Sequence, residues 1–125
     1  MVIAAPTVTA EQRASIDDAI ALWSSAGVTA FAIGDTPQVT VEFKTAAEAV
    51  YGYYDNTLAI VYVNTQVTDP TQRAIVVAHE LGHSLGLVHV APSTRLSVMN
   101  PGNLTVDPTA DDASALTAIW GSCTP

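Results

Sequence analysis

The sequence predicts an α+β fold, in which one helix precedes a group of strands and two helices follow them. Three observations support this prediction. Three segments begin with residues that cap helices, short β-branched runs lie between the first two of them, and turn residues separate these runs. The chain has 125 residues, enough for a modest core, and we expect residues 1–125 to form a single domain.

The three predicted helices each have a recognisable start. Residues 9–12 (TAEQ) form a capping box, whose two polar side chains pair with free backbone N–H groups, so a helix should run to about Ala26. Asp69, followed by a proline, should cap a second helix that ends near Gly86. The third helix should span Thr109–Trp120 with the threonine as its cap.

The predicted strands lie between the first two helices. Val28–Ile33 is rich in β-branched and apolar residues, Val39–Phe43 alternates apolar and polar positions, and Leu58–Asn64 is the clearest strand. Residues 44–54 are ambiguous, because residues 45–49 could form a helical turn whereas residues 51–54 suit an extended stretch. Residues 90–108 contain three prolines and should form a loop.

Composition restricts the possible partners. The net charge is −8 and the pI is about 4.3, which argues against nucleic acid or an anionic membrane surface as a partner. No apolar run is long enough to insert into a membrane, and the single cysteine, Cys123, rules out an internal disulfide. We expect a monomer. No secretory signal is visible at the N-terminus, so composition alone leaves the location open.

All three histidines lie within eleven residues, 79–89, in the pattern H-E-x-x-H-x-x-G-x-x-H. His79 and His83 are four residues apart, so on a helix their side chains share one face and can reach a single ion. Catalytic zinc is held by three protein ligands and keeps its fourth position open. The pattern therefore predicts one Zn²⁺ site, with His89 as the third ligand.

His89 can be that ligand only if the helix stops before it. On a continuous helix it would lie about 240° around the axis from His83 and about 9 Å further along. Gly86 stands where the chain must turn back, and glycine adopts the left-handed conformation that ends helices without a steric penalty. We therefore expect Gly86 to support the site structurally.

Glu80 follows the first ligand and lies about 100° around the helix from it. A carboxylate there can take a proton from a water as general base. Zinc lowers the pKa of its bound water to about 7 and polarises a carbonyl. The sequence thus predicts peptide-bond hydrolysis by a zinc-bound water without a covalent intermediate. Two simpler interpretations are ordinary histidines and a zinc ion that is structural or catalytically silent.

The motif, with the run SVMNP at residues 97–101, resembles the metzincin metalloendopeptidases and most closely a minimal matrixin, the matrix-metalloproteinase type. The resemblance implies a metzincin-like zincin: a twisted mixed sheet of four to five strands with an antiparallel edge strand, a backing helix, an active-site helix and a C-terminal helix. It implies the three histidines as zinc ligands, Glu80 as base, Met99 as an apolar floor beneath the zinc, and a secreted or extracellular protein.

The resemblance also implies supporting and substrate-binding residues. Asp111 and Asp112 resemble paired aspartates that brace the methionine turn and can hold the N-terminus, although a preference for acids at helix starts explains them equally well. Leu58–Asn64 would be the edge strand on which an extended peptide substrate pairs. The residues along that substrate would be Val61, Tyr62 and Val63; the alternative is an ordinary strand.

A pocket for the residue after the cleaved bond is implied between the active-site helix and the segment after Met99. Its lining would be Ile75, Val76, Val98 and Leu104, which predicts a preference for apolar residues. The sequence departs from matrixins at Val90, usually serine, and at residues 101–103, which lack the usual wall tyrosine. With no further histidine, a second zinc site of the usual matrixin form is excluded.

Two other functions use the same residues. A metzincin-like module could hold zinc and bind a partner with weak or no proteolysis, but such a module has no need for Glu80, so its presence favours the enzyme. A deamidase or other amide hydrolase would use the same chemistry as a peptidase.

Overall fold

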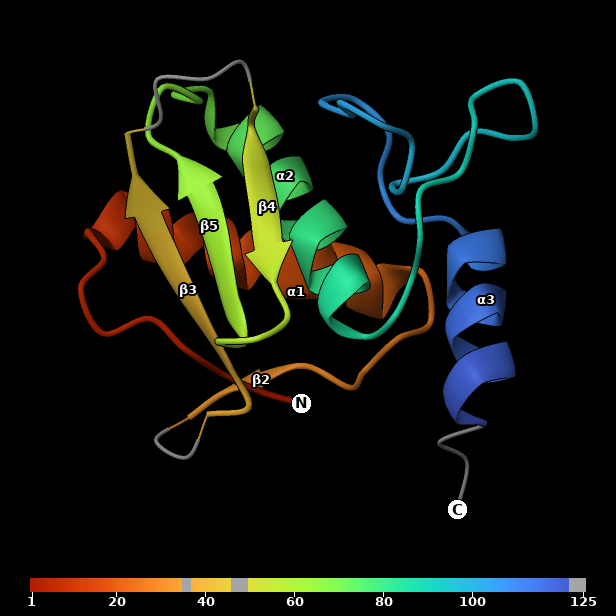
Figure 1. The fold of residues 1–125 in the computed structure, drawn as a ribbon, viewed down its shortest axis with the longest axis horizontal. Coiled ribbons are helices and arrows are strands. Elements are labelled where there is room, and N and C mark those ends of the chain that lie inside the picture. The colour runs from red at the N-terminus through yellow and green to blue at the C-terminus, as the bar shows by residue number, and fades with distance from the viewer. Residues whose placement is uncertain (35–36, 46–49, 122–125) are drawn as a thin grey trace.

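The computed structural model describes residues 1–34, 37–45 and 50–121 and shows the predicted α+β arrangement, with one mixed sheet and helices behind it (Figure 1). The elements in chain order are β1 (Val2–Ala4), α1 (Ala10–Ser25), β2 (Ala32–Ile33), β3 (Val39–Lys44), β4 (Gly52–Asp55), β5 (Ile60–Asn64), α2 (Pro70–Ser84) and α3 (Ala110–Trp120). Helices α1 and α2 cover one face of the sheet, and α3 lies to its side. Residues 46–49, where a helical turn was one expectation, and Cys123 lie outside the described residues.

The sheet has the strand order β2-β1-β3-β5-β4. Its first four strands run parallel to their neighbours, and only β4 pairs antiparallel, with β5. The expected antiparallel edge strand is therefore present, but it is β4, and the assignment of this role to Leu58–Asn64 is wrong. Strand β5 is hydrogen-bonded on both sides, because Val61 pairs with Val41 of β3 and with Tyr54 of β4.

Two other strand predictions need correction. Only Ala32–Ile33 of the expected strand at residues 28–33 is extended in the sheet, and β1 was not expected at all. Both strands are too short to show an alternation of apolar and polar residues, which is the signal that identifies a strand in a sequence. Leu58 and Ala59 form the turn that precedes β5.

The core lies between the sheet and the helices α1 and α2. The side chains that alternate onto the inner face of β3 and β5 are almost fully buried: Val39, Val41, Val61 and Val63. Trp23 of α1 packs among them with no exposed surface, and its indole N–H donates to the Ala78 carbonyl of α2 at 2.9 Å. This bond joins the two helices, and it fixes which face of α2 remains available for a site.

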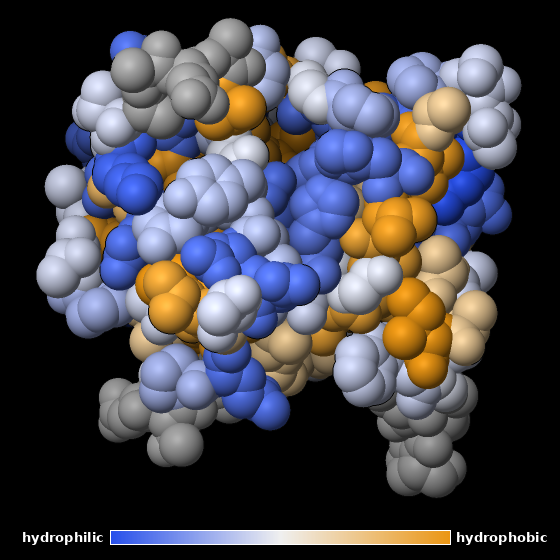
Figure 2. Space-filling view, viewed as in Figure 1, coloured by the Kyte–Doolittle hydropathy of each residue, from blue (hydrophilic) through white to orange (hydrophobic). Residues whose placement is uncertain are grey.

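The caps expected from the sequence are present at all three helices. Thr9 and Thr109 each form a reciprocal capping box, and the Asp69 carboxylate accepts the backbone N–H of Gln72 at 3.0 Å. Among the described residues, no helix combines the length and apolar character needed to cross a bilayer. Hydrophilic residues gather on the surface between β4 and the chain that follows α2, and apolar residues gather next to α3 (Figure 2).

Candidate metal centre

The three histidines converge at the C-terminal part of α2. One ring nitrogen of each lies within 4.8 Å of one from each of the others, a spacing that a single ion can bridge. His79 is buried, His83 is half-buried and His89 is exposed, so the group opens toward solvent on one side. Three nitrogen ligands with an open side match the pattern of catalytic zinc sites.

The chain reverses after α2 as the sequence predicts. Gly86 has φ of 98°, in the left-handed region. Its N–H donates to the His83 carbonyl at 3.0 Å, and the Leu87 N–H donates to the Gly82 carbonyl at 3.0 Å. These two bonds form the glycine-terminated helix end known as the Schellman motif. The reversal places His89 beside the two helical histidines.

The two helical histidines have their tautomers set by backbone carbonyls. Nδ1 of His79 donates to the Val98 carbonyl at 2.6 Å, and Nδ1 of His83 donates to the Leu87 carbonyl at 2.7 Å. A carbonyl can only accept, so Nδ1 carries the proton and Nε2 keeps a free lone pair. Partners of this kind hold metal-binding imidazoles in orientation.

The protonation of these imidazoles also suits a metal. Burial lowers the pKa of His79 to about 4, although its bond to Val98 opposes the shift. Burial likewise lowers the pKa of His83 below its ordinary value. A metal binds the neutral imidazole, so a histidine that stays neutral at pH 7 has no proton to lose on binding. The donor set therefore fits zinc.

Glu80 lies next to the histidines without belonging to the converging group. Its Oε1 is 3.7 Å from Nε2 of His79, and its side chain is almost fully buried. The other oxygen, Oε2, is buried and has no hydrogen-bond partner among the residues that the structure describes. Burial raises the pKa of Glu80 to about 7. A buried carboxylate with an unused oxygen and a raised pKa is typical of an acid–base residue.

A cleft runs along β4 on both sides of Glu80. One part has a volume of about 210 Å³ and is lined by Val50, Tyr51, Gly52, Val76, His79, Glu80, His89, Gly102 and Asn103. The adjoining part has a volume of about 430 Å³ and is lined by Gly52, Tyr53, Tyr54, Asn56, Glu80, His83 and His89. Because Gly52, Glu80 and His89 line both parts, the histidines lie at the middle of an open cleft.

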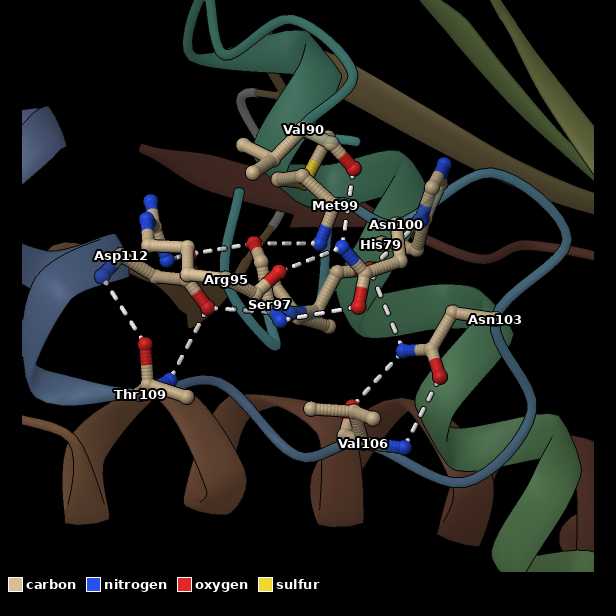
Figure 3. Close-up of polar contacts among 11 residues, drawn as sticks. His79, Val90, Arg95, Ser97, Met99, Asn100, Asn103, Val106, Thr109 and Asp112 are labelled. Carbon is tan, nitrogen blue, oxygen red and sulfur yellow. Dashed lines mark hydrogen bonds and ion pairs between the residues drawn. The ribbon is translucent and has the colours of Figure 1, made fainter. Parts of the chain in front are cut away.

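The turn around Met99 is held by one buried carboxylate (Figure 3). Asp112 of α3 has no exposed surface. Its carboxylate accepts four hydrogen bonds: from Ser97 Oγ at 2.5 Å, Arg95 Nη1 at 2.8 Å, and the N–H groups of Val98 and Thr109 at 3.0 Å each. Since the Val98 carbonyl accepts from His79, this brace extends from α3 to one of the three converging imidazoles.

Met99 lies directly against α2. It is 1% exposed, and a Cβ on Gly82 would be only 2.6 Å from its sulfur. The methionine can therefore pack beneath α2 because the residue before His83 has no side chain. The role of Met99 as an apolar floor beneath a zinc ion stays a prediction.

Comparison with protein families matches residues 30–121 to the matrixins. The chain belongs to the matrixin family. This is the family that the motif at residues 79–89 resembles. A comparison with curated protein sequences found no match.

Two solved structures of myroilysin resemble this matrixin. One is 24% identical with a TM-score of 0.54, and the match covers 71% of this chain and 48% of that one. The other is 20% identical with a TM-score of 0.53 and covers 100% of this chain and 63% of that one. The chain thus spans about half to two-thirds of the length of these relatives. At such identities the likeness shows a shared fold.

The structure corrects the expected position of the substrate strand in this matrixin. Val61 and Val63 have no exposed surface and point into the core. Tyr62 points to the opposite face of the sheet, where its ring stacks on Tyr53 with centroids 4.6 Å apart. These three residues belong to the inner strand β5, so they cannot lie along a substrate. The cleft is bordered by β4 instead.

The expected pocket residues are divided between different surfaces. Val76 lines the cleft, but Ile75 faces α1 and lies in a hollow with Asp18 and Asp107. Neighbouring positions on a helix point about 100° apart, and here the packing of α1 against α2 places Ile75 on the side away from the cleft. Leu104 packs against the hydrophobic core, and it is not one of the described residues that line the cleft. Val98 is fully buried and takes part through its backbone.

Only one of the two expected aspartates braces the turn. Asp111 is exposed, and Asp112 makes the contacts described above. The N-terminal ammonium does not reach this pair, because it donates to the Ala30 carbonyl.

Several residues of the cleft were not expected from the sequence, and Gly52 and Asn103 are two of them. A Cβ on Gly52 would lie 2.6 Å from the Tyr62 carbonyl oxygen, 3.1 Å from Cγ1 of Val76 and 3.3 Å from Cγ of Glu80. Gly52 therefore lets the edge strand approach the helix that carries Glu80. A glycine inside a strand signals such a close approach, and this signal was available in the sequence.

Proposed function

We propose that this chain is a zinc-dependent endopeptidase domain comprising residues 1–125. In this proposal His79, His83 and His89 hold one Zn²⁺ and Glu80 is the general base. The observation that carries it is the buried, unpartnered oxygen of Glu80 beside three converged imidazoles in an open cleft. The matrixin family also favours a secreted or extracellular protein with peptide or protein substrates.

When bound, zinc would supply Lewis-acid chemistry, by polarising the scissile carbonyl and acidifying a water. Glu80 would accept a proton from the attacking water and return it to the leaving amine. A pKa of about 7 suits a group that must both accept and donate a proton near neutral pH. Among the described residues, the cleft has no serine, threonine or cysteine in its lining, which favours hydrolysis without a covalent intermediate.

The edge strand β4 offers a binding surface for an extended substrate. The Tyr51 carbonyl accepts from the Asn64 N–H of β5 at 2.8 Å. Backbone groups point alternately to either side of an antiparallel strand, so those of Gly52 and Tyr54 point away from β5. A peptide could pair with them as an added strand beside the histidines. The role expected for residues 61–63 thus passes to β4.

The smaller part of the cleft suits an apolar side chain after the cleaved bond. Val50, Tyr51 and Val76 contribute its apolar lining, and Glu80 is its only carboxylate among the described residues. A pocket with apolar walls of this kind discriminates among apolar side chains by only about 1–3 kcal/mol per methylene. We therefore propose a broad apolar preference at this position.

A peptide library incubated with the purified protein tests the proposed function. We expect cleavage at internal bonds, loss of cleavage with a zinc chelator and recovery on adding zinc. Metal analysis should give about one zinc per chain, since structural and catalytic sites of this kind bind one ion. Alanine variants of each of the three histidines should weaken zinc binding.

Two results would contradict the proposal in different ways. Stoichiometric zinc without any cleavage would favour the alternative of a metal-holding binding module. Full zinc binding by all three alanine variants would place the metal elsewhere in the chain. A strong preference for charged residues after the cleaved bond would contradict the proposed pocket alone.

Replacement of Gly52 with alanine should lower kcat/KM by up to roughly 100-fold, because displacements of about 1 Å in an active site can cost this much. The new Cβ would collide with the Tyr62 carbonyl, so β4 must move from β5 or from α2. Zinc content should be unchanged, since Gly52 is not a ligand. The measurement is the kinetics of peptide cleavage by the zinc-loaded variant.

The control for this variant is Val61→Ala, which removes buried methyl groups from the neighbouring strand. This control variant should lower the stability of the protein without displacing β4. If both variants lost stability and activity in the same proportion, Gly52 would have no role beyond folding.

A further inference from the structure

Asn103 lines the cleft, but its side chain is bound entirely to its own loop (Figure 3). Nδ2 donates to the Val98 carbonyl at 3.2 Å and to the Val106 carbonyl at 2.7 Å. Oδ1 accepts from the N–H groups of Thr105 at 3.0 Å and Val106 at 2.8 Å. The residue is 9% exposed.

These four bonds use the whole capacity of the carboxamide. An asparagine side chain has two N–H donors and two acceptor lone pairs, and each has a partner here. The side chain can therefore border the cleft without offering a free polar group to a substrate. All four of its hydrogen bonds are made with backbone groups of residues 98–106.

The same bonds connect the cleft wall with a metal-binding histidine. The Val98 carbonyl accepts from Asn103 and from Nδ1 of His79. The N–H of Val98 is held by Asp112 at 3.0 Å. Both backbone polar groups of Val98 are thus fixed by side chains, one from α3 and one from the cleft wall.

We propose that Asn103 is a positioning residue of this site. It fixes the wall formed by residues 102–106 and, through the Val98 carbonyl, the orientation of His79, and it takes no part in polar recognition of substrate. The kinetic effects expected of Asn103 rest on the proposed function. The expected effect of Asn103 on metal binding is independent of catalysis.

The variant Asn103→Asp tests this proposal, because aspartate has the same shape and loses both donors. Zinc affinity, measured by competition with a chromogenic chelator, should fall by roughly tenfold, the lower end of what loss of an outer partner of a metal ligand costs. KM for peptides that differ in the residue after the cleaved bond should change unequally. In the original protein, peptides with a polar residue after the cleaved bond should not have a lower KM than peptides with an apolar residue at that position.

Asn100→Asp provides a matched control in the same turn. Asn100 is 6% exposed, donates to the carbonyls of Val90 at 2.8 Å and Arg95 at 3.1 Å, and accepts the Ser97 N–H at 3.0 Å. None of these contacts is with the Val98 carbonyl. This variant should lose stability in urea while its zinc affinity changes much less than that of Asn103→Asp.

The zinc titrations of the two variants decide the matter. An equal loss of zinc affinity in both variants would reduce Asn103 to a general stabiliser of the turn, and unchanged zinc affinity in Asn103→Asp would overturn the proposal. If Asn103→Asp fails to fold, Asn103→Ala allows the same comparison without a new charge. If no peptide is cleaved by any form, the proposed function fails, yet the zinc titrations still decide whether Asn103 orients His79.

Discussion

Peptide cleavage by a Glu80→Gln variant should be slower by roughly 10²–10⁴-fold, the usual contribution of a general base. Glutamine has the shape of glutamate but cannot take a proton from water. The variant should keep its zinc, because Glu80 is not a member of the converging histidine group. It should also fold at least as stably, since Oε2 makes no hydrogen bond that the replacement could remove and burial already disfavours the charged form.

The measurements are kcat/KM on one peptide, zinc content and the midpoint of unfolding. Glu42→Gln is the matched control, because it makes the same chemical change on β3 at a position paired with Tyr62 rather than near the cleft. An active Glu80→Gln variant with full zinc would refute the role of Glu80 as base. Loss of zinc in the variant would instead assign Glu80 to the metal site.

The convergence of the three histidines could be predicted because it depends on local geometry. The spacing of His79 and His83 fixes their common face, and the need for a chain reversal ahead of His89 identifies Gly86 from the sequence alone. The φ of 98° at Gly86 and the converged nitrogens agree with this reasoning. The helix caps were predictable for the same reason, since each involves residues three positions apart.

The substrate strand could not be predicted because it depends on distant pairing. Leu58–Asn64 has the stronger strand signal, but strong apolar character indicates burial on both faces of the chain, which is a property of an inner strand. The edge strand β4 has the weaker signal, with one glycine and two tyrosines in its four residues. The order of the strands in the sheet decides which strand borders the cleft. No local sequence pattern contains that order.

The same limit applies to single side chains. Ile75 and Val76 are adjacent and chemically alike, and only the packing of α1 against α2 determines that Val76 faces the cleft. Asp111 and Asp112 are identical, and only the position of the turn around Met99 selects the second. Asn103 could not be identified from a sequence pattern, because its proposed role depends on four hydrogen bonds to backbone groups.

Replacement of Asp112 with asparagine should destabilise the protein by roughly 3–5 kcal/mol, which is the cost of breaking a buried charge pair. The loss should lie nearer the lower value, because the Arg95 side chain is 27% exposed. An amide cannot accept all four hydrogen bonds that the carboxylate accepts, so at least one buried donor loses its partner. Urea denaturation at pH 7 measures the loss. Asp111→Asn is the matched control, and its exposed position predicts little change.

The stability difference between the original protein and Asp112→Asn should also depend on pH. Burial opposes ionisation of Asp112, but the hydrogen bonds from Ser97, Val98, Arg95 and Thr109 outweigh it, so its pKa lies below the ordinary value of 3.8. For a carboxylate with a lowered pKa in the folded protein, the stabilisation is complete above the unfolded pKa and is lost as pH falls through the folded one. The difference should therefore be constant from pH 7 to about pH 5 and should shrink below pH 3.8. A difference that stayed constant down to the acid unfolding of the protein, or an equal loss in Asp111→Asn, would show that the charge of Asp112 does not hold the turn beneath His79.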